Sequence, residues 1–218
     1  MKKLLIAFIA VFSLTLTAQD KLTEGKIVSK QTLSSDNEQL MQQLAMMGDM
    51  QTTTYFKDKK SRTELSNPMS GDVVTISNTE TNEFLTLMDN PMMGKKYTYV
   101  KNDKAEEMSK NIEVKAGEET KEILGYKCKQ YFVSIDQDGV QMTMEIFTTE
   151  AIPVASQQTS MLGDKLKGFP LYMVMDMNQM GNKMKITTEV TQIEKQSVSD
   201  DQFSMTPPEG YENMEGQN

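Results

Sequence analysis

The sequence contains no histidine, no tryptophan and a single cysteine, Cys128, among its 218 residues. Without histidine and with one thiol, the usual ligand sets for zinc and copper(II) are missing, and so are serine–histidine and cysteine–histidine catalytic pairs. One cysteine cannot form an internal disulfide, so the fold must be held together by its core. We therefore expect no cofactor, no metal site of the usual kind and no catalytic residue, which means a protein that is not an enzyme.

Positive charge is also scarce, because 31 acidic residues outweigh 23 basic ones. A surface with a net charge of -8 repels phosphate backbones and anionic membranes, so nucleic acid is not expected as a partner. Three acidic pairs, at 118–119, 136/138 and 200–201, fall in turns or helix caps, where carboxylates usually make local hydrogen bonds. We expect no acid–base catalysis from these pairs and no calcium loop after Asp136, since the glutamate that an EF-hand requires is missing.

Long apolar runs are confined to the start of the chain. Leu4 to Leu16 form such a run after a basic Met1-Lys2-Lys3, and Thr17-Ala18 follows as a small-residue cleavage point. This pattern predicts a signal peptide over residues 1–18 and export, with the periplasm of a Gram-negative bacterium as the expected location. No second apolar run follows, so we expect no stable membrane anchor after cleavage, a retained anchor being the alternative.

The remaining chain is expected to form one β-rich domain over 19–211, followed by an acidic, disordered tail over 212–218. Short runs rich in threonine and β-branched or aromatic residues alternate with turn signals every 8–12 residues, which favours an antiparallel sheet. Strands are expected at 23–33, 51–57, 60–66, 72–77, 83–88, 95–101, 111–115, 119–124, 126–135, 140–148, 171–177 and 184–190. Alternation slips between Cys128 and Tyr131, which predicts a bulge near Gln130 or burial on both faces.

Helical signals are few. Ser35-Asp36-Asn37-Glu38 matches a capping box, and apolar residues then recur at helical spacing until Gly48. This helix is expected either to cover the sheet or to act as a plug over a cavity. A second capping box predicts a short surface helix over 103–110, and a third predicts one turn after Ser199 that docks Phe203.

Methionine is the compositional anomaly, with 20 residues. Read at period two, two hairpins carry an apolar, methionine-rich face, which we expect to line a concave surface. The candidate lining residues are Met142, Met144, Leu171, Met173, Met175, Met177, Met184 and Ile186. Methionine moulds to irregular apolar shapes, so this face fits either ordinary core packing or a surface for flexible acyl chains. A copper(I) site built from thioethers, those of Met41, Met46, Met47 and Met50 or those of Met92 and Met93, is a third hypothesis.

Cys128 lies between Lys127 and Lys129, and neighbouring ammonium groups can lower the pKa of a thiol. Alternation places both lysines on the opposite face, which favours a small buried residue. A mixed disulfide or a redox role is the alternative.

Glu122 to Lys129, Gly168-Phe169-Pro170-Leu171, Phe203 and Pro208 to Tyr211 occur in an order that resembles a family of exported bacterial proteins, the DUF4412 type of domain of unknown function. That family is in turn similar to the outer-membrane lipoprotein carriers. The resemblance implies a mainly β (α+β) fold, a curved antiparallel sheet or open half-barrel with one or two helices covering its concave face. It also implies uptake of acyl chains by an apolar cavity, but it supplies no catalytic residue.

The resulting hypothesis is a non-enzymatic periplasmic protein that binds or carries a lipid or another hydrophobic molecule. Burial of methylene groups, at about 0.8 kcal/mol each, would supply the affinity. The alternative is an envelope protein whose core is filled by its own side chains and whose surface contacts another protein.

Overall fold

The computed structural model describes residues 20–67, 71–101, 112–137, 140–156, 158, 159, 162, 165–179 and 182–214. The expected signal peptide and the expected short helix over 103–110 lie outside these residues, as does most of the expected acidic tail. Within the described residues, no helix has the length and apolar character needed to cross a membrane.

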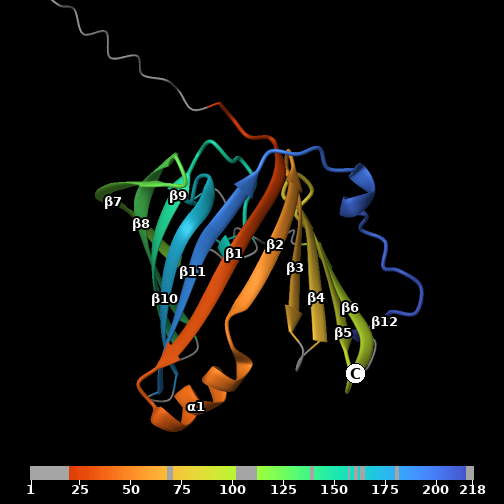
Figure 1. Cartoon of the computed structure of the whole chain (residues 1–218), viewed down its shortest axis with the longest axis horizontal. Helices are drawn as coiled ribbons and strands as arrows, with labels where there is room; N and C mark the ends of the chain where they lie inside the picture. Colours follow the sequence, from red (N-terminus) through yellow and green to blue (C-terminus); the bar gives the residue numbers. More distant parts are fainter. Residues whose placement is uncertain are drawn as a thin grey trace, which may run out of the picture.

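One curved sheet makes up most of the molecule (Figure 1). Its strands are β1 (Glu24–Ser35), β2 (Met50–Lys57), β3 (Lys60–Asn67), β4 (Gly71–Asn78), β5 (Glu83–Asn90), β6 (Gly94–Lys101), β7 (Ile112–Ile123), β8 (Tyr126–Gln137), β9 (Val140–Thr149), β10 (Phe169–Gln179), β11 (Asn182–Glu194) and β12 (Glu212–Asn213). The order across the sheet is β12-β6-β5-β4-β3-β2-β1-β11-β10-β9-β8-β7. The sheet bends so that β7–β11 face β3–β6 across a concave side, and it stays unclosed between its edges. This confirms the predicted half-barrel.

Two meanders build the sheet, and β1 joins them. β2 to β6 pair in sequence order on one side of β1, and β11 back to β7 do the same on the other. Every pairing in these meanders is antiparallel, as the short turns at regular spacing predicted. The connections therefore alternate between two ends of the sheet, and the β1–β2, β5–β6 and β10–β11 connections share one end.

The predicted helix exists as α1 (Glu38–Met47) and lies at that end (Figure 1). It begins two residues later than the capping box predicted. Its N-cap is Asn37, whose Oδ1 accepts hydrogen bonds from the backbone N–H groups of Gln39 and Leu40 at 3.0 and 3.2 Å. Ser35 still belongs to β1, and its hydroxyl donates to the Lys183 carbonyl at 2.6 Å. The helix thus forms most of the connection between β1 and β2.

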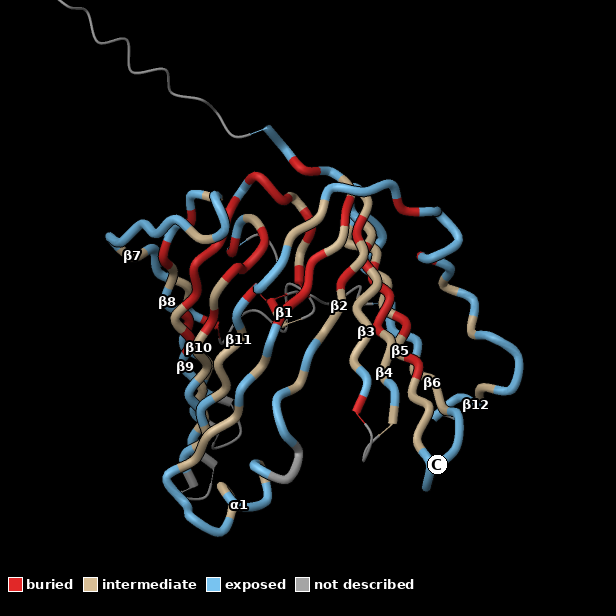
Figure 2. The backbone as a smooth tube through the Cα atoms, viewed as in Figure 1, coloured by how far each residue is buried: buried red, intermediate tan, exposed pale blue. Residues whose placement is uncertain are grey.

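The concave side is crossed by the described residues between 151 and 168 (151–156, 158, 159, 162 and 165–168), which we call the crossing segment. Its described side chains Leu162 and Leu166 pack on Val133, Met144 and Met173. The hydroxyl of Thr148 donates to the Lys167 carbonyl at 2.8 Å and holds the end of the segment. Figure 2 shows the buried residues concentrated around this segment and the end of the sheet opposite α1. The core therefore fills that end of the half-barrel.

The convex side of β3–β6 is covered by residues 198–211, which we call the C-terminal strap. It contains the one-turn η3 (Asp200–Phe203), which docks Phe203 as predicted. Phe203 and Val198 pack against Ile76, Leu85 and Leu87. Ser199, however, makes no side-chain capping bond. The apolar alternation of these strands is therefore directed outward, toward the strap.

Two local expectations needed correction. The tail was expected to be disordered from Glu212, but Glu212 and Asn213 form β12 and pair in parallel with β6. The Lys96 ammonium donates to the Glu212 carboxylate at 2.6 Å beside this pairing. The bulge predicted near Gln130 lies instead in β7, between Ala116 and Thr120, and the β8–β9 register is continuous.

The alternation of β8 slips because the strand is buried on different faces along its length. Cys128 and Gln130 are buried on one face, and Val133 is buried on the other. The Gln130 side chain lies over Gly117, where an added Cβ would come within 2.2 Å of the amide oxygen. The alternative of burial on both faces is therefore the correct one.

Candidate functional site: the two walls of the half-barrel

Methionines from β9, β10 and β11 form one wall of the concave side. The register places them in three rows that run from β9 through β10 to β11: Met142–Met177–Met184, Met144–Met175–Ile186 and Ile146–Met173–Thr188. Directly paired residues of an antiparallel sheet point to the same face, so the rows form one surface. We call Met142, Met144, Met173, Met175, Met177, Met184 and Ile186 the methionine wall.

Leu171 is the predicted lining residue that does not join this wall. The register between β9 and β10 shifts between Pro170 and Tyr172, so Leu171 lies in a bulge. It is fully buried in a separate cluster with Ile27, Phe56 and Val190. Leu171 is therefore core, and strict alternation could not place it because one extra residue changes the face.

Burial along the methionine wall changes from one end to the other. Met144 and Met173 are buried, at 3% and 2% exposure, because the crossing segment covers them. Met177, Met184 and Ile186, nearer to α1, are only half-buried. One end of the wall is thus ordinary core, as the first reading of the methionines predicted, and the other end presents accessible thioether and methyl groups.

The facing wall, on β2–β6, is built from hydroxyl groups. The register runs straight across five strands through Thr54, Thr63, Thr75, Thr86 and Thr98. A second row places Ser61 beside Ser77, with their hydroxyl oxygens 2.7 Å apart. The Thr54 and Thr63 hydroxyls lie 3.0 Å apart. We call these seven residues the hydroxyl wall.

The orientation of this wall follows from what covers each face. Tyr55, Val74 and Ile76, on the opposite face of the same strands, contact the C-terminal strap outside the sheet. Thr54 and Thr63 line a small cavity on the inner side. Apolar alternation alone does not reveal this wall, because its residues are polar. The signal was present as threonines at 63, 75, 86 and 98, one in each successive strand.

The walls meet at a cavity of about 20 Å³. It lies between Thr54 and Thr63 on one side and Met173 and Thr188 on the other, with Ser156 of the crossing segment between them. This volume suits one water molecule with several polar partners. The crossing segment is therefore fitted against both walls.

Three larger cavities lie outside the methionine wall. One of about 480 Å³ lies at the end opposite α1, between the turns at Lys59 and Asn82 and the crossing segment. One of about 310 Å³ is bordered by Lys21, Lys129 and Glu150. The third, of about 470 Å³, is lined by residues of β2, β3 and β4, including Thr53 and Val74 of the strap-facing side. Of these four cavities, only the 20 Å³ one includes a predicted lining residue.

Two groups of interacting charged side chains lie at the rim of the half-barrel opposite α1. The Lys129 ammonium lies 2.9 Å from the Glu150 carboxylate, and this hydrogen bond holds the pKa of Glu150 below its usual value. The same contact raises the pKa of Lys129. At the β5 end, hydrogen bonds from Thr81 and Tyr99 lower the pKa of Glu83. None of these groups belongs to either wall.

Cys128 is fully buried, and burial raises the pKa of its thiol to about 11. Lys127 and Lys129 are exposed on either side of it, as alternation predicted. The thiol donates a weak hydrogen bond to the Tyr126 carbonyl at 3.5 Å. Among the described residues, no three acidic, cysteine or histidine side chains cluster closely enough to hold a metal ion.

Comparison with known structures supports the fold. Two solved structures of PNGF-II, in the C2 and P21 space groups, match with TM-scores of 0.52 and 0.51 at 19% identity. They cover 87% and 89% of this chain, which spans only 31% and 32% of the PNGF-II chain. At this identity the likeness shows the fold alone, and no curated protein matches the sequence.

The family comparison covers most of the chain. Residues 38–211 match DUF4412, described as a domain of unknown function. This span runs from the start of α1 to the end of the C-terminal strap, and so includes both walls and the crossing segment. The chain therefore belongs to the DUF4412 family.

Proposed function

We propose that this protein binds an apolar or amphipathic molecule against the methionine wall, as an exported, non-catalytic protein of the cell envelope. The observation that carries the proposal is the half-exposed part of the wall near α1, where Met177, Met184 and Ile186 share one concave face. Thioether side chains adapt to flexible tails, and burial of each methylene contributes about 0.8 kcal/mol.

Helix α1 supports the same location. Leu40, Met41 and Leu44 are half-buried on a helix that follows directly from the end of β1. The backbone N–H of Ser35 lies 3.0 Å from the Met41 sulfur, so the apolar side of the helix is turned toward the strand end. Apolar groups from the helix and the wall thus gather at one end of the half-barrel.

Binding can be tested with an uncharged dye that fluoresces in apolar surroundings, N-phenyl-1-naphthylamine. We expect saturable binding by the mature protein. Met177→Glu, which places a carboxylate in the wall, should weaken it about 10-fold or more, equivalent to about 1.4 kcal/mol. Val174→Glu on the same strand is the matched control, because Val174 pairs with Thr187 and Glu145 on the opposite face.

The control should change the dissociation constant by less than about twofold. Absence of saturable binding, or equal losses in both variants, would contradict the proposal. Organic extraction of protein purified from its native envelope, followed by mass spectrometry, should in addition yield a stoichiometric apolar compound.

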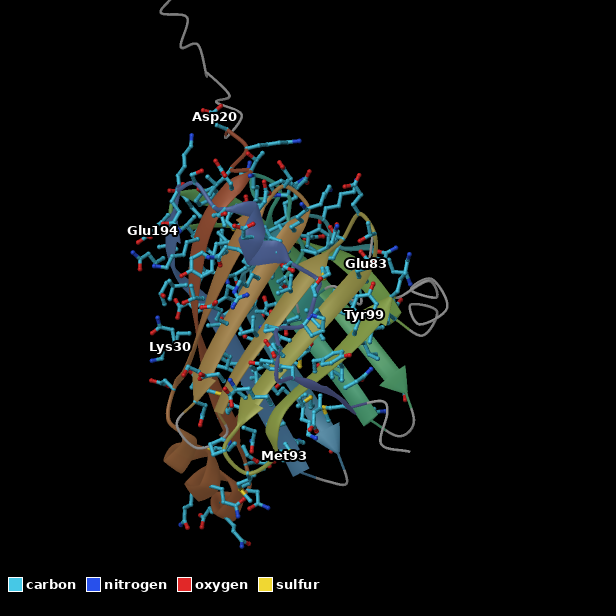
Figure 3. All side chains as sticks on the ribbon, turned by 90° about the vertical axis from the view of Figure 1, so that its right-hand side faces the viewer. Asp20, Lys30, Glu83, Met93, Tyr99 and Glu194 are labelled. Atoms are coloured by element: carbon cyan, nitrogen blue, oxygen red, sulfur yellow. The ribbon has the colours of Figure 1, made fainter. Side chains whose placement is uncertain are left out.

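A second function, contact with another envelope protein, is favoured by a different observation. Met92 and Met93, in the β5–β6 turn, are 93% and 58% exposed. Figure 3 shows Met93 at the end of the molecule where α1 lies. Replacing both with serine should leave dye binding intact, and loss of a co-purifying protein in that variant would favour this second function.

A further inference from the structure

The facing hydroxyl wall narrows the class of ligand. We infer that the bound molecule is an amphiphile with an uncharged polar head, one rich in hydroxyl or ester groups, whose tail lies on the methionine wall and whose head lies on the hydroxyl wall. This inference rests on the proposed function and names the ligand class for the same site.

The two walls belong to one space. Thr54 and Thr63 of one wall and Met173 of the other border the same 20 Å³ cavity. β1 joins the walls, since it pairs with β2 on one side and β11 on the other. A molecule that lies on the methionine wall therefore has the hydroxyl wall within the same concave surface.

The inward face of β2–β6, which includes the hydroxyl wall, is almost free of charge. Three rows of inward-facing residues cross β2–β6. Every residue in these rows is threonine, serine or apolar, except at one position. That position is Lys96, whose ammonium lies 2.6 Å from the Glu212 carboxylate. An anionic head would find no unneutralised cation in these rows, and a cationic head would find no carboxylate. Desolvating either head would therefore be uncompensated.

Two hydroxyls on this wall are available. Thr54 bonds to Thr63 and Ser61 bonds to Ser77, and Thr75 also has a partner. Within the described residues, the hydroxyls of Thr86 and Thr98 make no hydrogen bond, and both residues are half-buried.

Thr86 and Thr98 are direct cross-strand partners on β5 and β6, on strands about 4.8 Å apart. A hydroxyl both donates and accepts, so the pair matches the alcohol and ester oxygens of a neutral head.

The test compares ligands that share one acyl or alkyl chain length and differ in the head. A monoacylglycerol, an alkyl glucoside, a fatty acid and an alkylamine would each displace the bound dye at pH 7.5. We expect the two uncharged ligands to bind about 10-fold more tightly than the two charged ones. Whichever of the uncharged pair binds better separates a glycerol ester from a sugar head as the source of the hydroxyl groups.

Isosteric substitutions test whether the hydroxyl wall causes the preference for uncharged heads. Thr86→Val combined with Thr98→Val should weaken monoacylglycerol binding about 5- to 30-fold, the loss expected for one or two hydrogen bonds, and leave fatty acid binding unchanged. Thr53→Val combined with Thr187→Val, on the opposite face of the sheet, is the matched control and should change neither.

Thr86→Ser with Thr98→Ser should restore most of the preference. Equal affinity for charged and uncharged heads, or an equal loss for both in the valine variant, would overturn the inference while dye binding still upheld the proposed function. Absence of any acyl ligand and of dye binding would overturn the proposed function itself.

Discussion

At the scale of single residues, the two halves of the concave surface differ in the polarity of their side chains. Threonine and methionine occupy corresponding inward positions in the two meanders, and their side chains differ mainly in polarity and flexibility. Met173 and Thr188 are cross-strand partners at the junction of the two kinds. The polarity of the concave surface is thus set by single residue choices on an otherwise continuous strand pattern.

The single thiol gives a test at this scale. With a pKa of about 11, about one in a thousand Cys128 side chains is ionised at pH 8 in the folded protein, and the side chain is fully buried. We expect a disulfide reagent such as 5,5'-dithiobis-(2-nitrobenzoate) to react over hours with the native protein and within seconds in concentrated guanidinium chloride.

The control moves the thiol by one residue. Lys127→Cys combined with Cys128→Ser places it at an exposed position, where native reaction should be fast. Fast native reaction of the wild type would contradict the burial of Cys128. The raised pKa also makes the stability depend on pH. The contribution of Cys128 to stability is complete below its unfolded pKa near 9 and falls as pH rises toward 11.

At the scale of elements, the sheet depends on a segment distant in the sequence, the C-terminal strap. The strap covers Ile76, Leu85 and Leu87 on the convex side, and η3 presents Phe203 to them. The Lys57 ammonium also lies 3.2 Å from the Asp200 carboxylate, an exposed pair that adds little. Apolar burial by Phe203 is therefore the main attachment.

Phe203→Ala should lower the free energy of unfolding by about 3 kcal/mol, because it removes a nearly fully buried ring and leaves a cavity. Urea unfolding followed by far-UV circular dichroism measures the change. Phe132→Ala is the control, since Phe132 on β8 is 45% exposed and its loss should cost less than about 1 kcal/mol. Similar losses in the two variants would mean that the strap is not held by Phe203.

Much of this element level was predictable from the sequence. Turn residues such as Asn90-Pro91 and Asp58-Lys59, together with alternation, placed the strands of both meanders within a few residues. What failed was local: the helix cap moved from Ser35 to Asn37, and the bulge at Leu171 shifted a predicted lining residue into the core. The position of a helix cap depends on where the preceding strand ends, and the position of a bulge depends on packing against neighbouring strands. The residue pattern of one strand contains neither kind of information.

The candidate site was predictable only in part. The methionine rows follow from alternation on the two hairpins, because each hairpin turn fixes its own register. The burial of Met144 and Met173 depends on the crossing segment, whose polar sequence gave no sign of where it packs. To predict the hydroxyl wall, one must know which face of β2–β6 points inward. That depends on the C-terminal strap, which follows in the sequence only after β7–β11.

The whole molecule is one sheet, and the largest of its buried clusters draws on both halves of that sheet. Ile27 and Phe56 from the first half pack in the same cluster as Phe147 and Val190 from the second. β1 pairs along its length with strands of both halves. The two halves therefore share contacts that neither keeps without the other.

We expect a single cooperative unfolding transition in urea. Far-UV circular dichroism and tyrosine fluorescence, which is readable because the protein has no tryptophan, should give the same midpoint and slope. Separate midpoints for the two signals would mean that the halves unfold independently. A single-site change in the shared cluster, Phe56→Ala, should shift both signals together.

The opposite placement of the two ends of the described chain has a practical consequence. Asp20 lies at one end of the molecule, while Met214 follows β12 beside the start of β6, at the end where α1 lies (Figures 1 and 3). An affinity handle fused after Met214 would crowd the accessible thioethers. Immobilising the protein through its amino-terminal side would instead leave the half-exposed part of the methionine wall facing the solution. Ligand binding measured on a sensor chip requires that orientation.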